Sequence, residues 1–216
     1  MNNIFKEKRI LILSPHTDDA ELGCWGLISK LVEENAKIMW VVFSTAKESV
    51  PDGMPSDTLK KEFIDVVKYL KLKEDQYKIF DFKVRRLMES RQEVLDILIS
   101  IKKEFAPEII IGPSLNDFHQ DHIAVSNEMV RAYKNSASIL SYELPWNHLK
   151  FENQLFVKIS RSQLDNKIEL LKFYKSQFSM NRTYFSQQFI EGLARTRAAQ
   201  INAEFAEAFE IIKMIV

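Results

Sequence analysis

The segment from residue 9 to residue 19 reads RILILSPHTDD, an apolar run that ends abruptly in polar residues. Residues 9–14 show no alternation of apolar and polar side chains, which is typical of a strand buried on both faces of a parallel sheet. Residues 20–35 then place Leu22, Trp25 and Ile28 at helical spacing. A buried strand followed directly by such a helix predicts the opening unit of an α/β fold.

The same unit recurs along the first half of the chain. Further buried strands are predicted over residues 38–43, 77–80 and 108–111. Helices are predicted over residues 57–71, over residues 89–105, and from about residue 121 to residue 134. This alternation predicts a Rossmann-like, doubly wound and mostly parallel sheet with helices on both faces. We expect one domain over residues 1–216, because the sequence contains no internal repeat and no clear linker.

The second half of the chain is less regular. Strands are expected over residues 139–143 and 155–159, on either side of a Pro-Trp-Asn turn. A helix is expected where four apolar residues recur: Leu164, Ile168, Leu171 and Tyr174. A final long helix facing the core is expected from a second such series: Ile201, Phe205, Ala208, Phe209 and Ile212.

The composition argues against several classes of protein. Thirty basic side chains balance thirty acidic ones among the 216 residues, which is unlike a dedicated nucleic-acid binder. The longest apolar run, residues 38–43, is far shorter than the roughly 20 residues of a membrane span, and no signal-peptide core follows the N-terminus. Cys24 is the only cysteine, so no intrachain disulfide forms. We expect a cytoplasmic protein without an integral membrane segment or a nucleic-acid partner; a homo-oligomer is left open.

Three of the four histidines lie in two short acidic clusters. The clusters contain His16, Asp18 and Asp19 after the first predicted strand, and His119, Asp121 and His122 after the fourth. In a doubly wound sheet the first and fourth strands are neighbours where the strand order reverses, and ligands bind outside the carboxyl ends of strands at that point. We therefore expect the two clusters to meet in one crevice.

Imidazole and carboxylate groups together are typical ligands of zinc, and three protein ligands leave one position open for catalysis. Another first-row divalent metal is the alternative, whereas calcium or magnesium would draw mainly on oxygen ligands. Each residue also has a purely structural interpretation, since Asp18 or Asp19 would serve as a cap of the first helix and Asp121 as a cap of the helix that follows it. Those interpretations do not account for the pairing of histidines with acids in both loops.

A metal in this crevice predicts hydrolysis of an amide or an ester. Zinc lowers the pKa of a bound water to about 7. A neighbouring carboxylate accepts the remaining proton as general base, and a cationic imidazole stabilises the oxyanion and protonates the leaving nitrogen. The residues alone do not tell which aspartate is the base and which is a ligand.

Residues 15–23, PHTDDAELG, and residues 116–122, NDFHQDH, resemble the two signature motifs of the PIG-L/LmbE family of zinc-dependent N-acetyl sugar deacetylases. Weaker similarities occur at residues 142–146, at residues 176–177 and at residues 203–205 in the last expected helix. The resemblance implies the following roles: His16, Asp19 and His122 as ligands of one zinc ion, Asp18 as general base, His119 as the acid or electrophilic group, and Asp121 as the residue that orients and charges His119. It further implies a small-molecule substrate, an N-acetylated amino sugar or its conjugate, which yields acetate and a free amine.

The sequence departs from the family pattern near the expected sugar site. Thr17 stands where many members have proline or alanine, and residues 58–62 lack an arginine that many members carry. Candidate substrate contacts are Lys47, Lys60, Arg85, Arg86, Trp146 and His148, with solvated surface or packing as the alternative for each. Two other functions stay open, an amidase for a different amide conjugate and a non-catalytic metal- or sugar-binding module. No Gly-x-Gly-x-x-Gly motif follows the first strand to support nucleotide binding.

Overall fold

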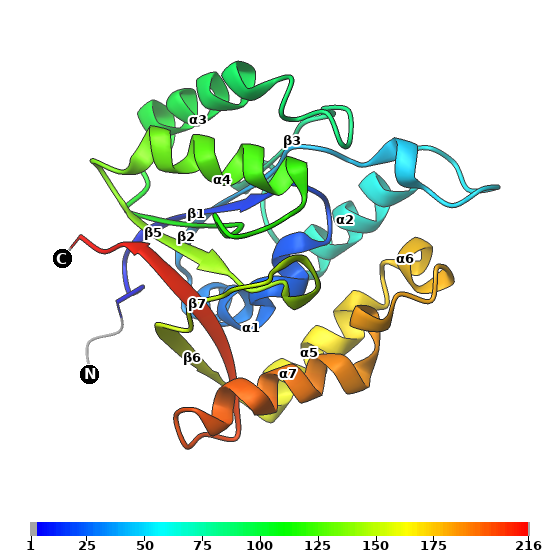
Figure 1. The fold of residues 1–216 in the computed structure, drawn as a ribbon, viewed down its shortest axis with the longest axis vertical. Coiled ribbons are helices and arrows are strands. Elements are labelled where there is room, and N and C mark those ends of the chain that lie inside the picture. The colour runs from blue at the N-terminus through cyan, green and yellow to red at the C-terminus, as the bar shows by residue number, and fades with distance from the viewer. Residues whose placement is uncertain (1–3, 216) are drawn as a thin grey trace.

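The computed structural model describes residues 4–215 (Figure 1). Its strands form one sheet in the order β3-β2-β1-β4-β5-β7-β6. The strands are β1 (Arg9–Ser14), β2 (Lys37–Val42), β3 (Tyr77–Ile79), β4 (Ile109–Gly112), β5 (Ser138–Tyr142), β6 (Leu155–Ile159) and β7 (Phe205–Lys213). The helices are α1 (Asp19–Glu33), α2 (Thr58–Tyr69), α3 (Arg91–Phe105), α4 (Gln120–Tyr133), α5 (Arg161–Leu171), α6 (Lys175–Ser179) and α7 (Gln187–Ala199).

The centre of the sheet is parallel and apolar. β1 pairs with β2 on one side and with β4 on the other, so that Ile12 lies between Trp40 and Ile111. All three side chains are fully buried. The strand order reverses between β1 and β4, which confirms the predicted doubly wound, mostly parallel fold.

Helices cover both faces of the sheet, as predicted (Figure 1). One apolar layer lies between the sheet and the pair α3 and α4, with Leu13 and Leu98 among its members. The other layer contains Trp25 of α1 and Phe63 of α2, and extends to α5 and α7. Among residues 4–215, no helix is both long and apolar enough to cross a membrane.

The helix predicted through residues 201–212 is wrong. Helix α7 ends at Ala199, and β7 follows as an antiparallel strand between β5 and β6. Residues 203–205, expected in that helix, lie at the turn into β7 and at its start. Both faces of β7 are buried over its first six residues, but Glu207 and Glu210 interrupt the continuous apolar run that identified the parallel strands. The apolar residues therefore fit a helical spacing by coincidence.

Candidate metal centre and active site

The first polar cluster lies in the turn between β1 and α1. The backbone N–H of His16 donates to Oδ2 of Asp19 at 2.7 Å, which holds that carboxylate close to the histidine. Asp18 occupies the N-cap position of α1, but its side chain makes no capping hydrogen bond. The carboxylates of this turn are therefore not explained by helix capping.

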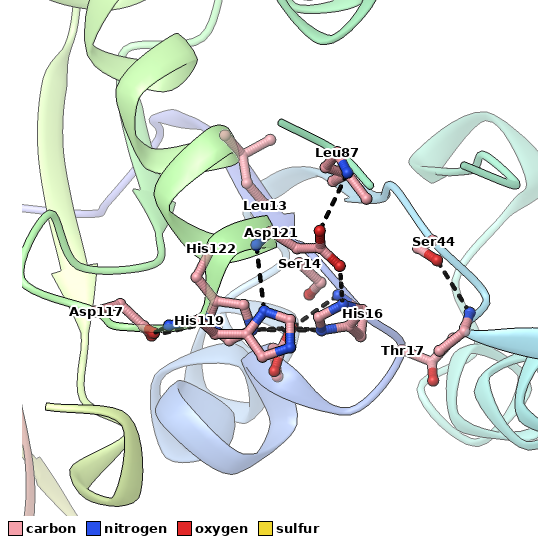
Figure 2. Close-up of polar contacts among 12 residues, drawn as sticks. Leu13, Ser14, His16, Thr17, Ser44, Leu87, Asp117, His119, Asp121 and His122 are labelled. Atoms are coloured by element: carbon pink, nitrogen blue, oxygen red, sulfur yellow. Dashed lines mark hydrogen bonds and ion pairs between the residues drawn. The ribbon is translucent and has the colours of Figure 1, made fainter. Parts of the chain in front are cut away.

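The second polar cluster lies where α4 begins, beside the first (Figure 2). His119 is the N-cap residue of α4, and its Nδ1 accepts the backbone N–H of Asp121 at 3.2 Å. The backbone N–H of His119 donates to Oδ1 of Asp117 at 2.7 Å. Because β4 is adjacent to β1, His16 contacts Asp121 across 105 positions of sequence, and the two clusters share one crevice.

Three donor atoms in this crevice form a nearly equilateral triangle. Nδ1 of His16 and Oδ2 of Asp19 are 3.2 Å apart, and Nε2 of His122 lies 3.3 Å from each of those two atoms. A tetrahedral metal with bonds of about 2.0–2.1 Å requires ligand atoms about 3.3 Å apart. The three atoms therefore fit one face of a tetrahedral metal site whose fourth position is open.

His119 stands next to this triangle rather than within it. The ligand atoms of His16, His119 and His122 lie within 4.8 Å of one another, which is wider than the triangle that includes Asp19. The Nδ1 atom of His119 is also occupied by a backbone N–H, as described above. The geometry favours a site in which His119 faces the reacting groups.

Carboxylates hold the outer nitrogen of both histidines in the triangle. Oδ2 of Asp121 lies 2.9 Å from Nε2 of His16, and Oδ2 of Asp117 lies 2.7 Å from Nδ1 of His122. Such contacts fix the ring orientation and raise the basicity of a metal-binding imidazole. Asp121 was expected to orient His119, yet its carboxylate contacts His16, and only its backbone N–H reaches His119.

The loop before α3 anchors Asp121 from its other side. The backbone N–H groups of Arg85 and Leu87 donate to the two carboxylate oxygens of Asp121, at 2.6 and 3.1 Å. Figure 2 shows the bond from Leu87. Arg85 has a positive φ of 66°, a costly conformation for a residue with a side chain. This backbone geometry turns both amides toward one carboxylate.

The electrostatics of the crevice favour a positive charge. Burial alone lowers the pKa of His16 and His122, but the charge of Asp19 and the bonds to Asp121 and Asp117 outweigh it. The resulting pKa values are about 9 for His16 and about 10 for His122. Burial opposes ionisation of Asp19, yet the two histidines hold its pKa well below the usual range. The same carboxylates stabilise a bound cation.

Asp18 and His119 differ from their neighbours in their protonation. Burial and the charge of Asp19 raise the pKa of Asp18 to about 6. Burial, together with the positive charges of His16 and His122, lowers the pKa of His119 to about 4. This lowered pKa favours a neutral imidazole at His119, whereas the expected role as an acid uses the cationic form. Because its Nδ1 accepts a hydrogen bond, Nε2 carries the proton.

The open side of the triangle faces a pocket of about 380 Å³. His16, Asp18, Asp19, His119 and His122 line it at one end. Its remaining walls include residues from the second half of the chain, of which the most polar are Asn147, Gln177, Arg182 and Tyr184. The pocket therefore combines the two sequence clusters with segments of the second half, among them Trp146 and Gln177 from the weaker similarities noted in the sequence.

Two of the six candidate substrate contacts, Arg85 and Trp146, line this pocket. The others lie outside it. Lys47 is paired with Asp81, Arg86 is paired with Glu89, and Lys60 and His148 are absent from the lining. The side chain of His148 is buried against Phe151, with Nε2 3.6 Å from Oδ2 of Asp117.

Sequence reasoning missed Asp117 and Arg182. Asp117 precedes His122 by five residues within the second motif, and this spacing was the available signal for its contact with that histidine. Arg182 precedes a short turn between α6 and α7, and nothing in its local sequence marks it as a pocket residue.

Strand β7 supports the first cluster through helix α1. Cys24 has non-helical backbone angles, so the helix is interrupted there. The freed N–H groups of Gly26 and Leu27 both donate to the carboxylate of Glu207 at 2.9 Å. Lys167 of α5 donates to the freed carbonyl of Leu22 at 2.7 Å and pairs with Glu207 at 3.0 Å. A buried ion pair thus joins the two parts of α1.

The same strand supports the loop that carries the second cluster. Glu210 accepts the hydroxyl of Ser114 and the side-chain amide of Asn116, the latter at 3.0 Å. Since neighbouring side chains alternate across a strand, Glu207 and Glu210 lie on opposite faces of the sheet. Each glutamate of β7 therefore holds one of the two polar clusters.

Comparison with known proteins gives a match to one family model. Residues 11–133, more than half of the chain, match PIG-L: GlcNAc-PI de-N-acetylase. A relative in Escherichia coli (strain K12), the uncharacterized deacetylase YaiS, is 29% identical over 176 residues. That match covers 79% of this chain and 92% of the relative.

Solved structures share the fold at low sequence identity. An N,N'-diacetylchitobiose deacetylase from Pyrococcus horikoshii superposes with a TM-score of 0.80 at 18% identity, over 98% of this chain and 86% of that one. GalB of Pseudomonas putida KT2440, a 4-carboxy-2-hydroxymuconate hydratase, gives a TM-score of 0.76 at 17% identity, over 97% and 98%. The fold thus serves more than one reaction, and the site must decide between them.

Proposed function

Because the chain belongs to the GlcNAc-PI de-N-acetylase family, we propose that it is a zinc-dependent hydrolase that removes the acetyl group from an N-acetylated amino sugar or its conjugate. Residues 1–216 would act as one catalytic domain. The observation that carries this proposal is the triangle of donor atoms from His16, Asp19 and His122, whose edges of 3.2–3.3 Å suit one tetrahedral zinc ion. The deacetylase relative supports the choice of reaction.

His16, Asp19 and His122 would hold the metal through Nδ1, Oδ2 and Nε2 respectively. When bound, zinc supplies a Lewis acid and a water that ionises near neutral pH. The carboxylates of Asp121 and Asp117 fix the two imidazoles, since each accepts the ring proton of one histidine. The protein therefore presents its ligands already oriented.

Asp18 would be the general base. Its carboxylate lines the pocket beside the open face of the triangle and makes no capping bond that would compete for it. A pKa of about 6 leaves most of the group ionised at neutral pH and close to the range that proton transfer favours. The proton that Asp18 takes from the attacking water is then available to the leaving nitrogen, so that acetate and an amine result.

His119 would stabilise the oxygen of the attacked carbonyl. Its Nδ1 is bound to the N–H of Asp121, which leaves the Nε2–H as the donor. Attachment to the first turn of α4 keeps this donor in place as negative charge develops. The backbone N–H of Asp121 donates to His119, and the side-chain carboxylate of Asp121 contacts His16.

A release assay tests the proposed reaction. We expect the zinc-loaded protein to liberate acetate from at least one compound in a panel of N-acetylated hexosamines and their glycosides. The matched controls are Asp18→Asn and an N-acetylated amine without a sugar. Acetate from the non-sugar amide alone would indicate a different amidase. No acetate from any amide, with zinc bound, would exclude deacetylation and leave a binding module or another reaction on this fold.

A further inference from the structure

The arginines of this chain divide into two groups. The chain has nine arginines, all within residues 4–215. Seven form ion pairs with carboxylates: Arg9, Arg86, Arg91, Arg131, Arg161, Arg195 and Arg197. The remaining two, Arg85 and Arg182, have no carboxylate within ion-pair distance in the described chain, and both line the pocket of the proposed active site. We propose that Arg85 and Arg182 form a subsite for an anionic group, a phosphate or a carboxylate, on the N-acetylated substrate.

Arg182 makes direct contacts only with neutral groups, and its charge also favours the ionised form of Asp18, which lines the same pocket. Its guanidinium donates to the hydroxyl of Tyr184, lies over the ring of that tyrosine, and has a weak contact of 3.7 Å with the sulfur of Met180. The Nε atom is buried and has no hydrogen-bond partner. A guanidinium without an ion-pair partner binds an oxyanion through strong, charge-assisted hydrogen bonds.

Arg85 reaches the same pocket from another segment. Its side chain donates to the hydroxyl of Ser49 at 2.9 Å, and Ser49 also lines the pocket. Its backbone N–H is fixed on Asp121 at 2.6 Å. The backbone of Arg85 is therefore bonded to Asp121 of the proposed metal centre, while its guanidinium has no carboxylate within ion-pair distance.

The chemistry of the pocket agrees with an anionic ligand. A guanidinium stays charged at every physiological pH and binds phosphate or carboxylate through two parallel hydrogen bonds. The two arginines come from different segments, Arg85 from the loop before α3 and Arg182 from the link between α6 and α7. Lys47 and Arg86, the other cations expected near the substrate, are paired with Asp81 and Glu89.

Three ligands that share one sugar and differ in its substituent test the subsite. The choice of an N-acetylated sugar rests on the proposed function. The ligands are the methyl glycoside of N-acetylglucosamine, its carboxymethyl glycoside and N-acetylglucosamine 1-phosphate, all of one anomer. Dissociation constants are measured in the zinc-loaded Asp18→Asn background, and kcat/KM is measured with the otherwise unaltered enzyme. We expect at least one anionic ligand to have a dissociation constant about tenfold or more below that of the methyl glycoside, and a kcat/KM about tenfold or more above it. The ligand with the larger ratio identifies phosphate or carboxylate as the recognised group.

Substitution of each arginine then locates the effect. Arg182→Gln and Arg85→Gln should each reduce the ratio between anionic and neutral ligands at least about threefold, and the double variant should bring it close to one. Arg86→Gln is the control, because Arg86 is adjacent in sequence but paired with Glu89 outside the pocket, and it should preserve the ratio. Equal affinities in the unaltered pocket, or a preference that survives the double variant because phosphate binds the metal directly, would overturn the subsite.

The two proposals fail in different ways. Preferential binding of an anionic ligand that depends on both arginines, without acetate release from any compound, would support the subsite and contradict the deacetylase. Acetate release at equal kcat/KM from charged and neutral glycosides would support the deacetylase and contradict the subsite.

Discussion

The sheet has two regions of different construction. From β3 to β5 it is parallel. All six residues to which we assign metal binding or catalysis lie between the end of β1 and the start of α1, or between the end of β4 and the first turn of α4. β7 and β6 are antiparallel additions at one side, and they supply none of those residues. β7 supplies the buried glutamates that hold both polar clusters. The chain between β6 and β7 supplies Arg182 and Tyr184 of the pocket wall.

The parallel region thus carries the proposed catalytic residues, and the antiparallel region supports them. The family match ends at residue 133, before β5 begins, and it contains every proposed ligand and catalytic group. Substitutions in the parallel region should therefore remove the chemistry from a protein that still folds. Substitutions in the antiparallel region should alter stability or substrate choice and leave the chemistry largely in place.

The largest effect is expected from His122→Ala. Loss of one of three metal ligands should reduce the zinc content from about one per chain to near zero and abolish hydrolysis. Elemental analysis of protein purified without added metal measures this directly. His148→Ala is the control, because His148 is also buried near Asp117 but lies outside the triangle, and it should keep its zinc. Full zinc occupancy in His122→Ala would remove His122 from the ligand set.

Asp18→Asn should come next. The variant keeps the shape of the side chain and all three proposed ligands, but it cannot accept a proton, so hydrolysis should fall about 10²–10⁴-fold. Zinc content and the melting temperature should be unchanged. Steady-state acetate release, measured together with zinc content, tests whether Asp18 is the general base. A variant with near-normal turnover would show that another group is the base.

Asp117→Asn should have an intermediate effect. The amide no longer accepts the ring proton of His122 as a carboxylate does, and loss of such a contact weakens metal binding about 10–100-fold. Competition with a zinc-binding dye gives the affinity, and activity should return when zinc is in excess. An unchanged affinity would mean that Asp117 serves the loop rather than the metal centre.

Glu207→Gln should have the smallest effect on the reaction and a clear effect on stability. The change leaves Lys167 buried without its counter-charge, which lowers the free energy of unfolding by about 3–5 kcal/mol. Lys167→Met in the same protein should recover part of that loss. Urea unfolding measures both, and the folded variants should lose less than about tenfold in kcat. A loss as large as that of Asp18→Asn, in a folded and zinc-loaded protein, would break the distinction between the two regions.

The parallel region was the predictable part of the fold. Its strands are short, mostly apolar and separated by helices with regular spacing, so that residues 9–14 and 38–43 identify buried strands without any knowledge of the neighbouring strand. β7 was not predictable in this way, because Glu207 and Glu210 interrupt its apolar run and its apolar residues also fit a helical spacing. Its glutamates, Glu207 and Glu210, resemble exposed helix positions in the sequence, and only the contacts across the sheet explain them.

The candidate site was likewise predictable only in part. The histidines and aspartates that the sequence placed together do converge, because β1 and β4 are adjacent. The partner of each outer nitrogen was not predictable, since Asp121 has its side chain on His16 and only its backbone on His119. Arg182 could not be selected from nine arginines, because what distinguishes it is the absence of a carboxylate neighbour in three dimensions.

The position of β7 also affects how the protein is made. Its contact with α1 joins Gly26 to Glu207 across 181 positions, and a nascent chain cannot form that contact until translation has passed the last strand. Until then β5 has an open edge that can pair with other chains, and two amides of α1 lack their acceptor. We expect the metal ligands to emerge from the ribosome long before their geometry is fixed, and zinc capture to follow the synthesis of β7.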